Sequence, residues 1–82
     1  MGTLLRLAGW RVMIYTLDHP PPHVHVVGPG GRAKIALNCA GGMPLPISAF
    51  GIRPDVLKEL TRTIAANQTM LCEAWRRTHG TA

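Results

Sequence analysis

Apolar and polar side chains alternate with a period of two in short runs within the first forty residues, which is typical of strands that bury one face. Two short runs of strand-forming residues, 3–7 and 10–15, flank Ala8-Gly9, a two-residue signal for a β-hairpin turn. Alternate positions of the second run are apolar: Trp10, Val12 and Ile14. We predict that these side chains face the core.

A second hairpin is predicted around Gly28-Pro29-Gly30-Gly31, where the glycines are expected to supply positive φ and the proline a fixed φ. A four-residue loop sets the register of the flanking strands, 24–27 and 32–37. The resulting cross-strand pairs are Val27 with Arg32, His25 with Lys34, and His23 with Ala36. One face is then apolar and predicted to be buried, with Val24, Val26, Ala33, Ile35 and Leu37. The other face, predicted to meet solvent, carries His23, His25, Arg32 and Lys34.

A Gly/Pro-rich segment, 38–52, is expected to be a loop, and after it the apolar period changes to 3.6. One helix is predicted over about 54–78, since Pro54 suits a first helical turn and Gly80 follows the last one. Its apolar stripe comprises Leu57, Leu60, Ile64, Leu71 and Trp75, interrupted at Asn67 and Gln68. The opposite face mixes charges of both signs, which is typical of a solvated helix.

These patterns predict a single α+β domain over 1–82, with an antiparallel sheet of about four strands, in two hairpins, packed against one long C-terminal helix. A chain of 82 residues forms one modest core, so a partner or a homodimer would add to its stability. No apolar run reaches the ~20 residues of a membrane span, and the N-terminus lacks the pattern of a signal peptide. We therefore expect a cytoplasmic protein in which Cys39 and Cys72 are free thiols.

Charge favours an acidic partner. Nine Lys and Arg residues stand against four Asp and Glu, for a formal net charge of +5. This excess suits nucleic acid or an acidic protein and does not choose between them. The basic residues are scattered, and the mixed charges on the predicted helix argue against a basic nucleic-acid-binding helix.

Chemistry-bearing residues concentrate in the segment Asp18-His19-Pro20-Pro21-Pro22-His23-Val24-His25. His23 and His25 alternate on one side of a strand, a common geometry for metal ligands. A turn that brings back His19 or Asp18 would complete an open site for a divalent metal such as zinc. The prolines stiffen this connection, because each ring fixes φ and restricts the residue before it.

Two other interpretations of the segment need no metal. In the first, the chain is a metal-independent ribonuclease, in which His23 or His25 moves protons and Lys34 or Arg32 stabilises the phosphorane. In the second, the histidines are structural, as outward polar residues of an edge strand. The candidates for binding a partner or an anion are Tyr15, Arg32, Lys34 and Trp75.

The same segment resembles the hallmark of domain-of-unknown-function family 4160, a family of small bacterial proteins. That hallmark is an acidic residue and His, one variable residue, then Pro-Pro-His-x-His. The matching positions are Asp18, His19, Pro21, Pro22, His23 and His25. The likeness continues to Ala33-Lys34-Ile35 and to Glu73-Ala74-Trp75, so it covers nearly the whole chain.

Proteins that resemble this chain are often encoded beside a second small protein, of domain-of-unknown-function family 2442, in an arrangement suggestive of a toxin–antitoxin pair. The resemblance therefore implies a cytoplasmic module that binds a small acidic protein partner through or beside its His/Pro motif. It transfers no catalytic residue. The alternatives remain a ribonuclease toxin, a metal-binding domain, and a protein that blocks a nucleic-acid site in phage or host defence.

Overall fold

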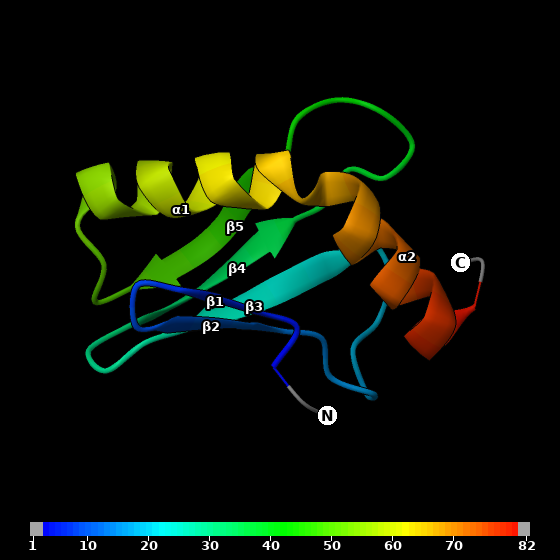
Figure 1. Ribbon diagram of the computed structural model, residues 1–82, viewed down its shortest axis with the longest axis horizontal. Coiled ribbons are helices and arrows are strands. Elements are labelled where there is room, and N and C mark those ends of the chain that lie inside the picture. Colours follow the sequence, from blue (N-terminus) through cyan, green and yellow to red (C-terminus); the bar gives the residue numbers. More distant parts are fainter. Residues whose placement is uncertain (1–2, 81–82) are drawn as a thin grey trace.

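One antiparallel sheet of five strands is covered on one face by two helices in the computed structural model, which describes residues 3–80 (Figure 1). The strands lie in the sheet in chain order: β1 (Leu5–Leu7), β2 (Trp10–Met13), β3 (His23–Val27), β4 (Arg32–Ala36) and β5 (Leu45–Phe50). The helices are α1 (Pro54–Ala66) and α2 (Gln68–His79). The α+β class is confirmed, whereas the numbers of strands and helices differ from the prediction.

Both predicted hairpins are present. Ala8 and Gly9 have positive φ values of 47° and 91°, as a two-residue hairpin turn requires. Strands β3 and β4 pair in the predicted register, with His25 opposite Lys34. The glycines of their turn lack the positive φ that we expected. Two of them are needed for space instead: a Cβ on Gly28 would overlap the indole of Trp10, and one on Gly31 would overlap the backbone of Phe50 and Gly51.

The core lies between the sheet and the helices, and its strand side is the predicted apolar face. That side consists of Val12, Ile14, Val24, Val26, Ala33, Ile35 and Leu37. The helix side consists of Leu60, Ile64, Leu71, Cys72, Ala74 and Trp75. The period-two and period-3.6 patterns therefore identified the buried surfaces of both layers.

Strand β5 corrects the prediction that 38–52 is a loop. It pairs with β4 from Arg32↔Phe50 to Ala36↔Leu45, with an irregularity between Lys34 and Ile35. Pro46 has no N–H to donate, and it is tolerated because β5 is an edge strand with a bulge-like shift. The Gly/Pro content hid the strand because it normally marks a loop.

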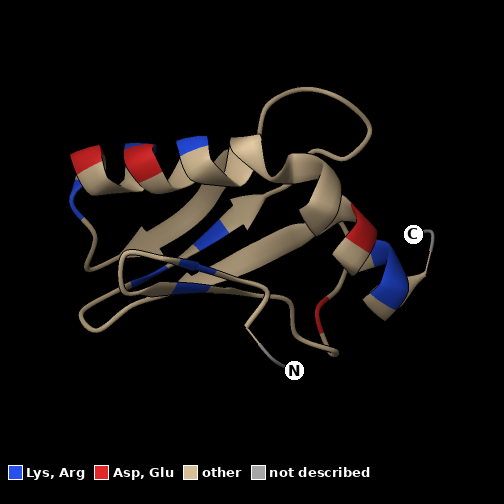
Figure 2. Ribbon diagram, in the orientation of Figure 1, with Lys and Arg blue, Asp and Glu red and all other residues tan. Residues whose placement is uncertain are grey.

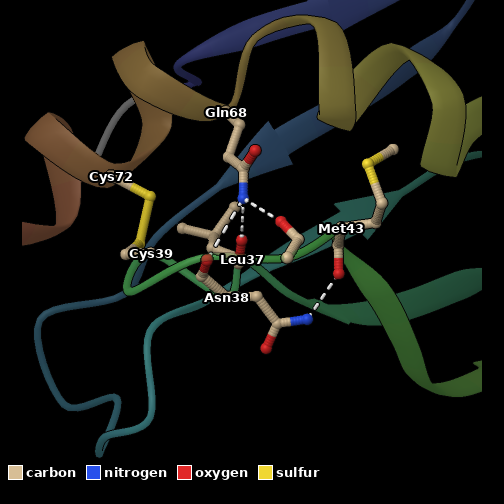
Figure 3. Close-up of a disulfide and its surroundings, with 7 residues drawn as sticks. Leu37, Asn38, Cys39, Met43, Gln68 and Cys72 are labelled. Atoms are coloured by element: carbon tan, nitrogen blue, oxygen red, sulfur yellow. Dashed lines mark hydrogen bonds between the residues drawn. A yellow bond between two sulfur atoms is a disulfide. The ribbon is translucent and has the colours of Figure 1, made fainter.

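The prediction of a single long helix is also wrong, because the helix is interrupted at Asn67. This residue has φ −114° and ψ 17°, outside the helical range, and its Nδ2 donates to the carbonyl of Thr63 at 2.8 Å. Gln68 then begins α2, and its Nε2 contacts three carbonyl oxygens, those of Leu37, Asn38 and Gly42 (Figure 3). Asn67 and Gln68, which interrupt the apolar stripe, thus have separate roles. Asn67 bends the helical segment, and Gln68 holds the loop after β4 through the contacts that we call the Gln68 clamp.

Cys39 and Cys72 form a disulfide, so the prediction of free thiols is wrong. Their Cα atoms lie 5.8 Å apart, within the ordinary range for a disulfide. The bond joins the loop after β4 to α2, beside the Gln68 clamp (Figure 3). The disulfide was missed for two reasons. A separation of 33 residues matches no recognisable disulfide spacing, and the sequence did not predict the bend at Asn67 that brings α2 to this loop.

Neither helix of the described residues has the length and hydrophobicity that a membrane span needs.

Candidate functional site

The loop between β2 and β3 holds Asp18 in a fixed position at the start of β3. The backbone N–H of Tyr15 donates to Oδ2 of Asp18 at 2.9 Å, and the N–H of Asp18 donates to the carbonyl of Tyr15 at 3.1 Å. This reciprocal pair of hydrogen bonds closes a turn of four residues. The Pro20–Pro21 peptide bond that follows is cis. Asp18 is therefore positioned by backbone contacts and keeps its second carboxylate oxygen for other partners.

Asp18, His23 and His25 converge at one point. Oδ1 of Asp18 lies 2.9 Å from Nε2 of His25 and 3.6 Å from Nε2 of His23. One potential ligand atom from each of the three residues lies within 4.8 Å of the others. The motif thus folds back on itself, and of the two open candidates, Asp18 and His19, it is Asp18 that joins the two histidines.

Hydrogen bonds determine which nitrogen of each imidazole ring carries the hydrogen. Nδ1 of His23 lies 2.9 Å from the carbonyl oxygen of Pro21, which can only accept, so this nitrogen carries the hydrogen. In the neutral ring Nε2 of His23 therefore holds a lone pair that faces Asp18. Nε2 of His25 donates to the Asp18 carboxylate. Each imidazole is fixed in orientation by one neighbour.

Asp18 is ionised at neutral pH. Burial raises its pKa, but the hydrogen bond from His25, the backbone hydrogen bond from Tyr15 and the charges of the two histidines together outweigh burial. The net pKa of Asp18 lies below the ordinary value for an aspartate. The cluster therefore contains a permanent negative charge next to two imidazoles.

A chain of rings continues from the cluster to α2. Centroid distances are 4.4 Å for Tyr15–His25, 5.1 Å for His25–His23, 5.3 Å for His23–Trp75 and 4.1 Å for Trp75–His79. His79 also contacts the Tyr15 carbonyl through Nε2 at 3.0 Å, and because a carbonyl only accepts, this nitrogen donates. The C-terminal half of α2 therefore closes one side of the site.

Burial differs between the two strand histidines. His25 keeps 20% of its side chain exposed, whereas His23 keeps 8% and packs against Trp75. The prediction that both rings meet solvent is thus correct for His25 and wrong for His23, because the unforeseen bend at Asn67 brings α2 over the end of β3. Trp75 itself is 0% exposed, so it packs against His23 from α2 and offers no surface to a partner.

His19 stands apart from the other residues of the motif. It is exposed and lies outside the cluster that the described residues form. Of the four predicted metal-ligand candidates, the structure brings together Asp18, His23 and His25 and leaves His19 outside their cluster. The turn that fixes Asp18 decides this outcome, and sequence spacing alone left both residues open.

The sheet face away from the helices is rich in cations. A row of directly paired residues crosses all five strands: Arg6, Arg11, Val27, Arg32 and Phe50. The next row is Met13, His25, Lys34 and Ser48. We call these two rows the open face. The five strands carry four basic side chains and no acidic one, whereas the acidic residues lie on the helices and on the loop before β3 (Figure 2).

The open face is hollowed beside His25. A shallow pocket of about 470 Å³ has among its lining residues Tyr15, His25, Arg32, Lys34, Ser48 and Phe50. The guanidinium of Arg32 lies 5.2 Å from the centroid of the Phe50 ring, within cation–π range. Three of the predicted partner or anion residues, Tyr15, Arg32 and Lys34, thus line one pocket with His25.

Sequence reasoning missed Arg6, Arg11 and Phe50 as members of this face. Arg6 and Arg11 form a cross-strand pair, which the register of the Ala8-Gly9 turn already implies. Phe50 had no such signal, because its strand was taken for a loop. The edge formed by β5 is apolar as well as exposed, with 61% exposure for Leu45, 53% for Ile47 and 70% for Phe50.

Comparison with models of protein families matches residues 9–76 to one described as "Domain of unknown function (DUF4160)". The matched range contains the whole Asp18–His25 segment, strands β2 to β5, helix α1 and most of α2. Comparisons with curated proteins and with solved structures gave no match.

Proposed function

We propose, from the premise that the chain belongs to the DUF4160 family, that it is a small interaction module whose open face binds an acidic protein partner beside the His/Pro motif. In this proposal the module is one component of a toxin–antitoxin-like pair in the cytoplasm. The partner is a small protein with a carboxylate-rich surface.

The concentration of charge on the open face supports this proposal best. Arg6, Arg11, Arg32 and Lys34 come from three strands, and no strand carries a carboxylate that would neutralise them. Such a field attracts an acidic surface and raises the rate of association. It also disfavours a homodimer through the same face, because a second copy would place like charges opposite one another.

The β5 edge favours a protein over a nucleic acid. Leu45, Ile47 and Phe50 are exposed along it, and an edge strand presents unpaired backbone N–H and C=O groups. A protein partner satisfies both features by adding a strand or an apolar side-chain row. A phosphate backbone complements the cations but leaves this apolar edge uncovered.

The direct test is a calorimetric titration of the chain with a small acidic protein of domain-of-unknown-function family 2442, the partner type that the resemblance implies, at low and at high salt. We expect a one-to-one complex that weakens as salt rises, because screening reduces the attraction between exposed charges. Single-stranded RNA is titrated in parallel. Tighter binding of RNA than of the acidic protein, or no complex with the protein, would contradict the proposal.

RNA cleavage is a second candidate, because His25 has the setting of a general base. Asp18 accepts from Nε2 of His25, which leaves Nδ1 as the proton acceptor, and Lys34 is the direct cross-strand neighbour of His25. His25 would take the proton of a ribose 2′-hydroxyl as that oxygen attacks phosphorus. The bond from phosphorus to the 5′-oxygen would break, which gives a 2′,3′-cyclic phosphate, and the 5′-oxygen would take a proton from water. Lys34 would stabilise the negative charge of the phosphorane.

If the chain cleaves RNA, His25→Ala and Lys34→Ala are each expected to lower the cleavage rate by about 100-fold or more. His19→Ala is the matched control, since His19 belongs to the same motif but is exposed outside the cluster. The measurement is cleavage of a labelled RNA, together with growth arrest on expression. Equal activity of all three variants and the wild type would exclude this candidate.

A further inference from the structure

We propose that Asp18, His23 and His25 form a site for one divalent transition-metal ion of the zinc type. The proposal goes beyond partner binding, which uses the open face and requires no metal. It rests on the convergence of one carboxylate and two imidazoles in a partly enclosed position.

The distances fit a tetrahedral ion. Bonds of ~2.0–2.1 Å to nitrogen and oxygen place neighbouring ligand atoms about 3.3 Å apart. Oδ1 of Asp18 lies 2.9 Å and 3.6 Å from the two imidazole Nε2 atoms, and one ligand atom from each residue lies within 4.8 Å of the others. Small side-chain rotations are therefore enough to bring all three atoms into bonding distance of one ion.

The surroundings hold the ligands as metal ligands are usually held. Nδ1 of His23 donates to the Pro21 carbonyl, which leaves the Nε2 lone pair free to bind a metal. Oδ2 of Asp18 accepts from the Tyr15 N–H, so Oδ1 is the oxygen directed at the histidines. Only His25 has to change, by moving its hydrogen from Nε2 to Nδ1. This change of tautomer breaks its hydrogen bond to Asp18 and needs no net loss of a proton from a neutral ring.

The donor set selects the class of ion. Two imidazoles and one carboxylate suit zinc, iron, cobalt or nickel, whereas magnesium and calcium prefer oxygen ligands only. Cys39 and Cys72, which form the disulfide, are not part of the cluster of Asp18, His23 and His25. The metal would therefore depend on these three side chains alone among the described residues.

The site keeps one side open. The exposed fraction of the side chain is 8% for His23, 11% for Asp18 and 20% for His25, so access is from the His25 side. There Lys34 is the cross-strand neighbour of His25, and both line the pocket on the open face. A fourth ligand would therefore be water or an anionic group, since Lys34 favours negative charge at this position.

The experiment uses the full disulfide-bonded chain, purified without a histidine tag and freed of metal with a chelator that is then removed. Zn²⁺ alone is titrated by calorimetry, and bound metal is counted by mass spectrometry. We expect one ion per chain, and at least a tenfold weaker affinity in Asp18→Asn and in His25→Ala. His19→Ala, the matched control, is expected to bind as the wild type does.

Co²⁺ provides a second readout that a merely structural role would not change. Its visible absorption is expected to show four-coordinate geometry in the wild type and in His19→Ala, and to lose this signature in Asp18→Asn. Circular dichroism of each variant shows whether it is folded. A zinc content near zero, or equal affinity in all variants, would overturn the proposal. Partner binding is measured separately in the presence of chelator, so failure of the metal site and failure of the interaction module are distinguished.

Discussion

Replacing both Arg32 and Lys34 with glutamate is expected to weaken binding of the acidic partner by about 100-fold or more. These residues lie on β4 in neighbouring rows of the open face, and both line its pocket. Loss of two attractive contacts and their replacement by repulsion costs about 3 kcal/mol or more of binding free energy, and each ~1.4 kcal/mol is a factor of ten in affinity. Calorimetric titration of the variant with the same partner measures the change.

The matched control is Lys58→Glu with Arg62→Glu on α1. Both residues are exposed, and the double change alters the net charge of the chain by the same amount on the opposite side of the sheet. Binding through the open face predicts that this variant keeps most of the affinity and that the reversed Arg32/Lys34 variant does not. Equal losses in the two variants would mean that only net charge matters, and the open face would not be the interface.

The hairpins were predictable because local chemistry determines them. The turn at Ala8-Gly9 and the four-residue turn before Arg32 each fix a register, and side-chain alternation then decides which face is buried. The pairing of His25 with Lys34 followed from turn length alone. The core residues of both hairpins followed from the same alternation.

The second half of the chain depends on contacts that are distant in sequence. Strand β5 forms because β4 offers an open edge, although Pro46 and the glycines before it favour a loop. The helix breaks at Asn67 because Gln68 finds carbonyl partners in the loop after β4. The hydrophobic periodicity of the sequence reveals neither contact. The missed strand β5 and the missed bend at Asn67 therefore both depend on tertiary contacts.

The candidate site shows the same division. The sequence supplied its residues, since the spacing of His23 and His25 places them on one strand with Asp18 nearby. It did not reveal that Trp75 buries His23, because that contact depends on the bend between the two helices. Arg6 and Arg11 pair across the first hairpin, as the length of its turn implies, but they are distant from the motif in sequence, so the motif gives no sign of them.

Reduction of the Cys39–Cys72 disulfide is expected to remove about 4 kcal/mol of the free energy of unfolding, because the bond closes a loop of 33 residues in the unfolded chain. A domain of 82 residues has a total stability of about 4–12 kcal/mol, so this loss is a large share of it. Urea unfolding followed by circular dichroism, with and without a reductant, measures the effect. The midpoint is expected to fall by roughly 2–3 M, or the reduced chain to be unfolded without urea.

The control for this prediction is the double variant Cys39→Ser with Cys72→Ser. Its urea midpoint should equal that of the reduced wild type and should not change when the reductant is added. A wild-type midpoint that does not move on reduction would show that the disulfide adds nothing to stability.

If the prediction holds, a chain kept in a reducing cytoplasm functions in its less stable dithiol form. Binding of a partner to the folded state then stabilises that state, and the gain grows with the logarithm of the partner concentration divided by its Kd. The acidic partner is therefore expected to raise the midpoint of the reduced chain, and the Arg32/Lys34 reversal to abolish that rise.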